Sequence, residues 1–465
     1  MRLTVLATLA TVASARPFLP DLTSADWAQI QSGFSVENLG SLASGIASGI
    51  VDKINGAQKA VEEYSGDDTQ KTIWQQINDD SDNYSKLIKV LNFEEDHKKV
   101  IDKRQDGYRI TFFAPNNDAL KCPHHKDDDL EAAFINEQDI GLAQVSAAID
   151  SLETMGGDDK DKKRKKEIFK KIAHYVLQYH VLAQDFDEQA LAQNSTIATT
   201  LRGPAGGSAG HKLRLHIEKH LVPPSLKLNF HSTIKSTHNA QNGVWHEIDH
   251  PLYPPVSIFA EALMITEYLS TTAAGIQAAH GRHFIEWEYD HEKSRKNRPV
   301  FAGTPAATFV APSNKAWDAV PEGLRRFLFS PMGRRALAKT FAYHYLPRQI
   351  LFSETYHKAK DIWSEDEDEG VWEVDSFGDD PSFKRTIDAP TGLKGHKIKF
   401  EIEKKKLLPV EGAVKVSIKV EGKDLQVIDV PASNGAWHII DEVLCPPHDD
   451  KHKHLAPRTW DNWEE

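Results

Sequence analysis

The stretch that decides the fold reads Ile110-Thr-Phe-Phe-Ala-Pro-Asn-Asn-Asp-Ala-Leu120, and it recurs as Ala307-Thr-Phe-Val-Ala-Pro-Ser-Asn-Lys-Ala-Trp317. Two further blocks recur downstream in the same order. Gly210-His-Lys-Leu-Arg-Leu-His-Ile-Glu-Lys219 returns as Gly395-His-Lys-Ile-Lys-Phe-Glu-Ile-Glu-Lys404, and Asn242-Gly-Val-Trp-His-Glu-Ile-Asp249 returns as Asn434-Gly-Ala-Trp-His-Ile-Ile-Asp441. A Tyr-His pair stands between the first and second blocks, at Tyr179-His180 and at Tyr343-His344. This order indicates a tandem duplication of a unit of about 190 residues.

Each copy of the unit has the pattern of helices followed by strands. The β-prone run 111–114 stops at Pro115, which cannot donate a ladder hydrogen bond. Residues 166–182 carry apolar side chains at helical spacing, whereas runs beginning at Leu213, Leu226, Ile398 and Val414 alternate between apolar and polar residues. The dipeptides Asn-Gly at 242–243 and 434–435 are typical of hairpin turns. We therefore predict an α+β fold, with an antiparallel β region wrapped by helices in each copy.

The N-terminal residues predict secretion. Residues 1–15 combine a positive start, a short apolar run and a small-residue cleavage pattern, which is typical of a signal peptide. Residues 16–68 are predicted to be a leader with one weakly amphipathic helix. The sequons at Asn83 and Asn194 predict glycosylation, in keeping with a secreted protein. No later stretch approaches the roughly 20 apolar residues of a spanning helix.

Composition limits the classes of partner. The chain has 465 residues, with 56 basic and 68 acidic ones, and its net charge of −12 argues against a nucleic-acid binder. Its 22 histidines make this charge sensitive to pH near about 6.5. The two cysteines, Cys122 and Cys445, either form a disulfide or stay as two buried thiols. Charge runs such as 158–166 and 364–370 predict solvated loops.

The repeated blocks resemble the fasciclin I domain, an extracellular adhesion module. The first box resembles T-x-F-A-P-x-N-x-A at residues 111–119 and again at 308–316, where Val310 replaces a phenylalanine. The Tyr-His pairs match the central motif of the family. The closing box resembles N-G-x-x-H-x-I-D-x-x-L-x-P at residues 242–254 and 434–446. The similarity covers domains at 69–256 and 257–447, which leaves a polar, His-rich tail at 448–465, and the layout looks like that of secreted fungal members.

The resemblance implies a secreted or cell-surface adhesion or matrix protein that binds cell-surface proteins or wall and matrix glycans and has no catalytic activity. Its location would be extracellular, with the cell wall or a vacuolar lumen as alternatives. The binding or structural motif residues would be Tyr179, His180, His246, Tyr343, His344 and His438. We favour a structural role for the four histidines, in which each makes buried hydrogen bonds. The other histidines could strengthen binding to polyanions in acidic surroundings.

Two alternatives remain from the residues themselves. His246, Glu247 and His250 match H-E-x-x-H and could form a secreted zinc hydrolase, but that chemistry needs a helix, and the preceding Asn-Gly turn and Pro251 favour a strand. A small-molecule or lipid binding module would instead use an apolar pocket. Neither the histidines of the tail nor Cys122 with its neighbouring histidines offers four ligands at a recognised spacing, so we predict no metal and no cofactor. The oligomeric state is left open.

Overall fold

The structure is a computed structural model. It describes residues 70–121, 141–154, 159–221, 224–290, 293, 300–360, 372–377, 382–406 and 414–445. The predicted signal peptide, the leader, the His-rich tail, Cys122 and the acidic run at 364–370 lie outside these residues. No helix within the described ranges is long and apolar enough to cross a membrane.

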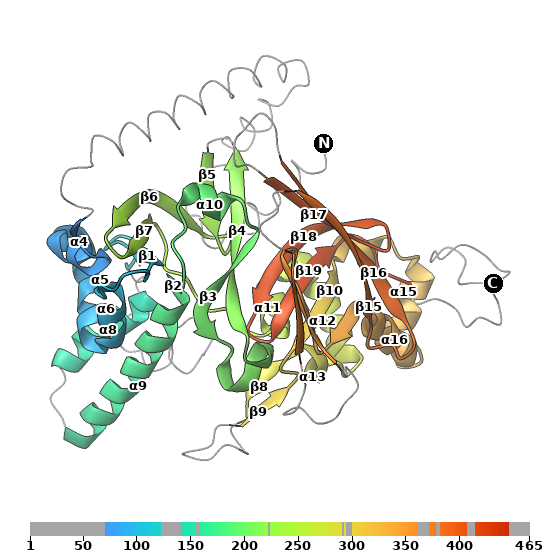
Figure 1. Ribbon diagram of the computed structural model, residues 1–465. Coiled ribbons are helices and arrows are strands. Elements are labelled where there is room, and N and C mark those ends of the chain that lie inside the picture. The colour runs from blue at the N-terminus through green and yellow to red at the C-terminus, as the bar shows by residue number, and fades with distance from the viewer. Residues whose placement is uncertain are drawn as a thin grey trace, which may run out of the picture. The chain divides into compact units, whose positions relative to one another are not determined.

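The first repeat begins with three helices and continues through alternating helices and strands (Figure 1). Its elements are α4 (Ile73–Asp79), α5 (Ser81–Glu94), α6 (Asp96–Ile101), β1 (Ile110–Pro115), α8 (Leu142–Thr154), α9 (Asp159–Tyr179), β2 (Val181–Leu182), α10 (Glu188–Ala192), β3 (Thr196–Arg202), the 3-10 helix η5 (Pro204–Gly210), β4 (Lys212–Leu221), β5 (Pro224–Leu228), β6 (Ser232–Ala240) and β7 (Gly243–Ile248).

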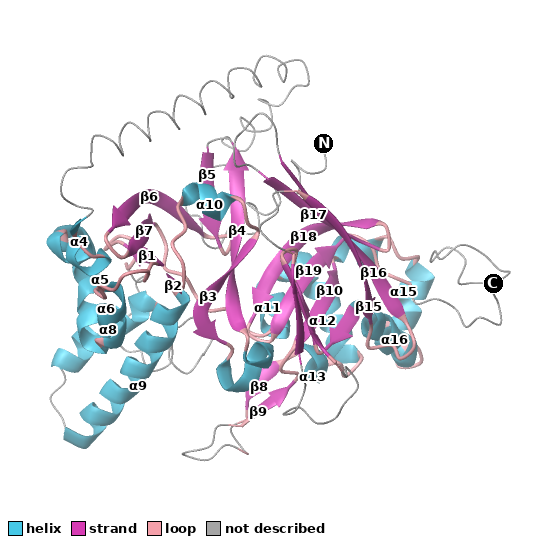
Figure 2. Cartoon of the chain, in the orientation of Figure 1, coloured by secondary structure: helices cyan, strands magenta, loops and turns pink. Residues whose placement is uncertain are grey.

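The second repeat follows the same order from helices to a strand-rich end. Its elements are α11 (Ile258–Met264), α12 (Thr266–Ala278), α13 (Arg282–Ile285), β8 (Trp287–Tyr289), β9 (Phe301–Gly303), β10 (Ala307–Pro312), α14 (Asn314–Asp318), α15 (Glu322–Leu328), α16 (Arg334–His344), β11 (Tyr345–Pro347), β12 (Gln349–Leu351), β13 (Thr355–Ala359), β14 (Trp372–Ser376), β15 (Phe383–Pro390), β16 (Lys397–Lys406), β17 (Val414–Val420), β18 (Lys423–Ala432) and β19 (Gly435–Ile440). Helices and strands are both abundant in each repeat (Figure 2), which confirms the predicted α+β class.

The chain divides into two compact units whose limits differ from those of the repeats. Among the described residues, the first unit holds those up to Ala192 together with Glu218–Leu252. The second unit holds Gln193–Ile217, Tyr253–Lys406 and the described residues from Val414 onward. Strands β3 and most of β4 therefore pack with the second unit. The domain limits of 69–256 and 257–447 stay a prediction.

The β region of each repeat contains one parallel pair that the sequence pattern does not indicate. In the first unit, β1 pairs antiparallel with β2 and parallel with β7, and β7 pairs antiparallel with β6. In the second unit, β10 pairs antiparallel with β11 and parallel with β19, in a sheet of order β11-β10-β19-β18-β17-β16-β15. The strand of the first box thus lies beside the strand of the closing box in both repeats, with matching registers.

The Asn-Gly dipeptides lie at hairpin turns, as predicted. Only the asparagine is in the turn, and the glycine is the first residue of the following strand. Ala240 pairs with Gly243, and Ala432 pairs with Gly435, so the asparagine is the second of two loop residues. A Cβ atom on Gly243 would lie 1.9 Å from the carbonyl oxygen of Ile110, and one on Gly435 would lie 1.9 Å from that of Ala307. Glycine is needed because the parallel neighbour approaches too closely for any side chain.

The asparagine of each dipeptide connects the closing strand to the helix that begins the repeat. Asn242 Oδ1 accepts a hydrogen bond from the backbone N–H of Ile73 at 3.0 Å, and Asn434 Oδ1 accepts one from that of Ile258 at 3.0 Å. Both asparagines are almost fully buried. Helices α4 and α11 start at these points because Thr72 and Ser257 cap their first turns. In each repeat, the asparagine side chain therefore pairs with a backbone N–H at the start of the helix that would otherwise be buried without a partner.

Apolar side chains from helices and strands form a separate core in each unit. In the first unit, buried residues of α4, α5, α8 and α9 pack against β1 and β7, with Leu87, Phe112 and Trp245 among them. In the second unit, Phe400 and Ile418 of the sheet pack with residues of β10 and β12. The alternation along β4, β16 and β17 places their apolar residues in the interior, as predicted.

One predicted loop is a helix. The basic run at 162–166 lies inside α9. Lysine and arginine have high helix propensity, and the apolar stripe that continues through Ile172 and Val176 carries the helix on into the core. The prediction of a solvated loop for this run was therefore wrong.

Candidate functional site

The Tyr-His pairs sit where a helix ends and a short strand begins, between α9 and β2 and between α16 and β11. His180 Nε2 accepts a hydrogen bond from the backbone N–H of Leu252 at 3.0 Å, and its Nδ1 donates to the Val176 carbonyl at 2.9 Å. Both neighbouring tyrosines are buried, and Asn229 Nδ2 donates to the Tyr179 hydroxyl at 2.8 Å.

His344 makes the matching contact in the second repeat. Its Nε2 accepts from the backbone N–H of Leu444 at 2.8 Å, while Nδ1 donates to the Val310 carbonyl at 2.7 Å. Leu252 and Leu444 hold the same place in the closing box. Burial lowers the pKa of His180 and of His344 to about 4, so both rings are neutral at pH 7. The central box is thus joined to the closing box by one imidazole in each repeat.

The histidines of the closing box form hydrogen bonds with the segments that follow the central Tyr-His pairs. His246 Nε2 donates to the Phe186 carbonyl at 2.8 Å, and Nδ1 lies 2.8 Å from the Thr237 hydroxyl. His438 Nε2 donates to the Leu351 carbonyl at 3.1 Å, and Nδ1 accepts from the Asp429 backbone N–H at 3.0 Å. Burial lowers the pKa of both rings to about 4. Since both nitrogens of each ring have protein partners, neither ring offers a lone pair to a ligand in this arrangement.

The threonine of the first box has a duplicated role that sequence reasoning missed. Thr111 Oγ1 donates to the Gln184 carbonyl and accepts from the Phe186 backbone N–H, both at 2.8 Å. Thr308 Oγ1 donates to the Gln349 carbonyl and accepts from the Leu351 backbone N–H, both at 2.9 Å. The recurrence of threonine at the start of both boxes was the available signal.

The residues of the H-E-x-x-H match do not converge. His246 and Glu247 lie on strand β7, as the Asn-Gly turn predicts, so they point to opposite faces of the sheet. Glu247 accepts hydrogen bonds from Asn116 Nδ2 at 2.7 Å and from the Ser236 hydroxyl at 3.0 Å. His250 lies beyond the strand and contacts Asp249 at 2.9 Å. The helix that a zinc protease requires is absent from this described segment.

The structure describes one of the two cysteines and both predicted glycosylation sites. Cys445 is half-buried, and because Cys122 lies outside the described residues their pairing stays a prediction. Asn83 is exposed on α5, where a glycan could be attached. Asn194 is half-buried next to Ser195 and Thr196, which are buried. Glycosylation at both sites also stays a prediction.

The second unit buries a group of charged residues outside the family boxes. Glu354 accepts hydrogen bonds from the Ser195 backbone N–H at 2.6 Å and from the Thr196 hydroxyl at 2.9 Å. Arg214 donates to the Thr196 hydroxyl at 2.7 Å. Burial raises the pKa of the nearby Asp429 carboxyl, although Ser353 donates to it through both its N–H and its hydroxyl. Each carboxylate is satisfied locally, which is what a buried charge requires.

A cavity of about 270 Å³ lies in the same unit. Its lining includes Arg202, His211, Arg214, Phe352 and His357. The rings of His211 and His357 are 4.2 Å apart, and burial lowers the pKa of both, that of His357 to about 4. Within the described residues, His211 Nε2 and His357 Nδ1 are buried and lack a hydrogen-bond partner. The cavity therefore combines apolar wall, cationic groups and unsatisfied ring nitrogens.

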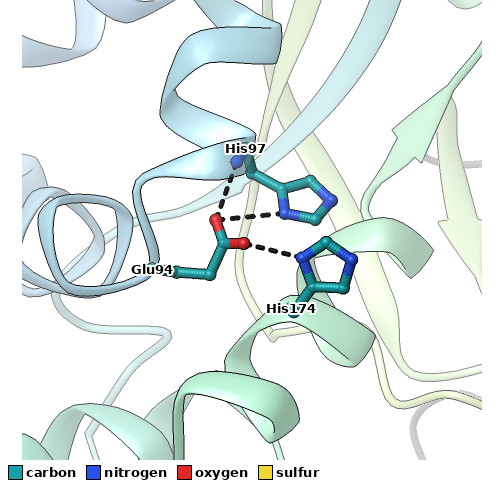
Figure 3. A group of neighbouring side chains, drawn as sticks. All are labelled: Glu94, His97 and His174. Carbon is teal, nitrogen blue, oxygen red and sulfur yellow. Dashed lines mark hydrogen bonds and ion pairs between the residues drawn. The ribbon is translucent and has the colours of Figure 1, made fainter. Parts of the chain in front are cut away.

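A polar cluster with one unaligned ring nitrogen, His97 Nδ1, lies in the first unit, where α5, α6 and α9 meet (Figure 3). Glu94 Oε1 lies 2.7 Å from His174 Nδ1, and Glu94 Oε2 lies 3.2 Å from His97 Nδ1. Burial tends to raise the pKa of Glu94, but contacts from the side chain and backbone of His97 and from His174 lower it to about 2. Sequence reasoning missed this cluster. The spacing Glu94-x-x-His97 was the one local signal.

Together these observations define a tandem α+β protein in which duplicated polar boxes hold each module together. A comparison with protein families agrees, because the Fasciclin domain model matches residues 148–254 and 291–446, which make up more than half of the chain. The chain belongs to the fasciclin domain family.

Two known proteins are similar to it. Aurofusarin biosynthesis cluster protein S from Gibberella zeae is 30% identical over 218 residues, which cover 45% of this chain and 46% of that protein. The match thus spans about half the length of this curated relative. A solved FAS1 domain pair from the insect cell adhesion molecule fasciclin I covers 81% of this chain and 96% of its own, with 13% identity and a TM-score of 0.26.

Proposed function

We propose that this protein is a secreted, non-enzymatic adhesion or matrix protein that binds cell-surface proteins or wall glycans. The observation that carries the proposal is the match of the fasciclin model to both repeats, since these domains are known in adhesion-type proteins and are generally non-enzymatic. They are also typically extracellular or at the cell surface, which agrees with the signal-peptide pattern at residues 1–15 and with sequons at Asn83 and Asn194.

The binding surface in this proposal is the outer face of strands β15, β16 and β17, which we call the lysine face. It carries six lysines and three carboxylates that the strand registers place on one side of the sheet. These are Lys384, Asp388, Lys397, Lys399, Glu401, Glu403, Lys405, Lys415 and Lys419. The excess of positive charge is opposite in sign to the net −12 of the chain and suits an anionic glycan.

The register adds a second argument for an anionic partner. Lys405 lies directly opposite Lys415, and both are exposed. Like charges that face one another across a strand pair are destabilising, and a bound anion removes that cost. The neighbouring Glu403 pairs with Lys405 at 2.9 Å, which offsets one of the two charges. Binding of an acidic polymer would therefore reduce the repulsion between Lys405 and Lys415.

The experiment measures binding of the purified mature protein to polygalacturonate, with a neutral β-glucan as the comparison. Replacing Lys397, Lys399, Lys405 and Lys415 with glutamine should weaken binding at least 10-fold and reduce its salt dependence. A matched variant that replaces Lys163, Arg164, Lys165 and Lys166 of α9 with glutamine removes the same charge elsewhere and should bind normally. Equal weakening in both variants would show that only net charge matters and would reject the lysine face.

The cavity of the second unit favours a second candidate function, the binding of a small anionic molecule. Its volume of about 270 Å³ is just below the usual range for ligand sites, and its cationic lining suits a carboxylate. A similar protein is named for a biosynthesis cluster, which is consistent with a small-molecule ligand. Ligand-observed NMR with benzoate and related acids tests this. Binding lost in His357→Ala and Arg202→Ala supports the candidate, and equal binding by both variants rejects it.

A further inference from the structure

We propose that Glu94, His97 and His174 bind one divalent transition-metal ion, with zinc as the best-fitting metal. The three residues come from separate helices. Glu94 ends α5, His97 lies in the first turn of α6, and His174 lies near the end of α9. Figure 3 shows all three side chains directed at one another. This site is independent of the lysine face and of the cavity in the second unit.

The ligand atoms are already assembled. One atom from each residue can be chosen so that all three lie within 4.8 Å of one another. The two contacts to the carboxylate measure 2.7 Å and 3.2 Å. Zinc bonds of about 2.0–2.2 Å in tetrahedral geometry place neighbouring ligand atoms roughly 3.3–3.5 Å apart. The two contacts, which go to different carboxylate oxygens, would change by less than about 1 Å, and the widest pair of ligand atoms would close by up to about 1.5 Å to reach coordination distance.

The sharp bend between α5 and α6 creates this arrangement. Glu95 has φ 69°, an uncommon left-handed conformation for a residue other than glycine. The bend brings the Glu94 side chain back to the start of α6, where its Oε2 accepts from the His97 backbone N–H at 2.7 Å. Capping of α6 accounts for this one contact. It does not account for two imidazoles that converge on the same carboxylate.

An unsatisfied nitrogen gives the second, independent observation. His97 is 5% exposed, and its Nδ1 is buried without an aligned hydrogen-bond partner among the described residues. A buried polar atom without a partner is costly, and it is rare unless water or an ion occupies the position. Nδ1 is the atom directed at Glu94. A metal ion would satisfy it.

The chemistry and the surroundings suit zinc. Two imidazole nitrogens and one carboxylate oxygen form the three-ligand set of open zinc sites, in which water takes the fourth position. Glu94 is fully buried, whereas the His174 side chain is 43% exposed, so an ion can enter beside His174. Gln178 Nε2 lies 3.0 Å from His174 Nε2. When Nδ1 binds metal, the ring carries its proton on Nε2, and the turned amide of Gln178 accepts it as an outer partner.

The test uses the full mature protein, freed of metal and then titrated with Zn²⁺ and with Co²⁺. We expect one tightly bound equivalent, a Co²⁺ absorption spectrum of tetrahedral type and a higher unfolding midpoint with metal. His174→Ala is the main variant because this side chain is half-exposed and its removal should leave the fold intact. It should weaken binding at least 100-fold, and His97→Asn should do the same. Gln178→Leu should weaken it about 10-fold to 100-fold.

His250→Ala is the matched control, since it removes another partly exposed histidine that contacts a carboxylate. It should bind one equivalent as the wild type does. Circular dichroism of each metal-free variant verifies its fold, and a misfolded variant is replaced by Glu94→Gln, which keeps the size of the side chain. Unchanged affinity in His174→Ala, loss of the metal in His250→Ala, or no stoichiometric binding by the wild type would each overturn the proposal.

Discussion

Replacing His344 with glutamine should make the free energy of unfolding of the second repeat less dependent on pH. The ring is fully buried, and burial lowers its pKa from 6.5 to about 4 in the folded protein. Between these two values the unfolded chain binds a proton that the folded protein does not. The stability that depends on the neutral ring is therefore complete above about pH 6.5 and declines as the pH falls toward about 4.

The magnitude follows from the width of that interval. One pKa unit corresponds to 1.36 kcal/mol, so lowering the pH from 7 to 5 should cost the wild type about 2 kcal/mol through His344 alone. Glutamine does not titrate, and His344→Gln should lose about 2 kcal/mol less over the same interval. The variant should also be less stable at pH 7, because the backbone N–H of Leu444 and the Val310 carbonyl lose their shared partner.

Urea denaturation at pH 7 and pH 5, followed by fluorescence of the buried tryptophans, measures this difference. His283→Gln is the control, since it makes the same substitution at an exposed position. If His344→Gln and the wild type lose the same free energy of unfolding between pH 7 and pH 5, the ring is not held neutral and the reasoning fails.

Two further substitutions test the contacts of the Asn-Gly dipeptide in the second repeat. Asn434→Ala should lower the free energy of unfolding by about 2–4 kcal/mol, because the Ile258 N–H and the Thr304 carbonyl each lose a hydrogen bond to its side chain, and chemical denaturation measures the loss. Gly435→Ala should prevent folding or lower the melting temperature severely, because its Cβ would collide with a backbone oxygen at 1.9 Å. Gly422→Ala is its control, since Gly422 also has a positive φ of 78° but a Cβ there meets nothing within 4 Å, so it carries the backbone strain without the collision. Equal melting temperatures for the two variants would contradict the close approach.

The strands and the repeat could be predicted from sequence because their signals are local. Alternation along β16 and β17 marks one buried face, and the boxes recur in order whatever their structure. The parallel pairing of β1 with β7 could not be predicted, since it joins strands far apart in the chain. The basic run of α9 was read as a loop because charge is a weak guide when the same residues are good helix formers.

The candidate metal site shows the limit of a search based on duplication. Glu94, His97 and His174 have no counterparts in the blocks that identify the second repeat, so comparing the two copies passes over them. The spacing of Glu94 and His97 is visible in the sequence, but the third ligand comes from α9 and depends on how the helices pack. Side chains that serve the fold recur in both copies, whereas the cluster of Glu94, His97 and His174 occurs in one.

The most direct test of the proposed function is equilibrium binding of the purified mature protein to the wall and surface fraction of the producing organism. It is measured at pH 7 and at about pH 5, with circular dichroism verifying the fold at each pH. Burial lowers the pKa of each boxed histidine to about 4, so these four rings stay largely neutral at pH 5 and are not the source of stronger binding there. We expect saturable binding that strengthens at the lower pH. Folded protein that shows no saturable binding at either pH would contradict the account.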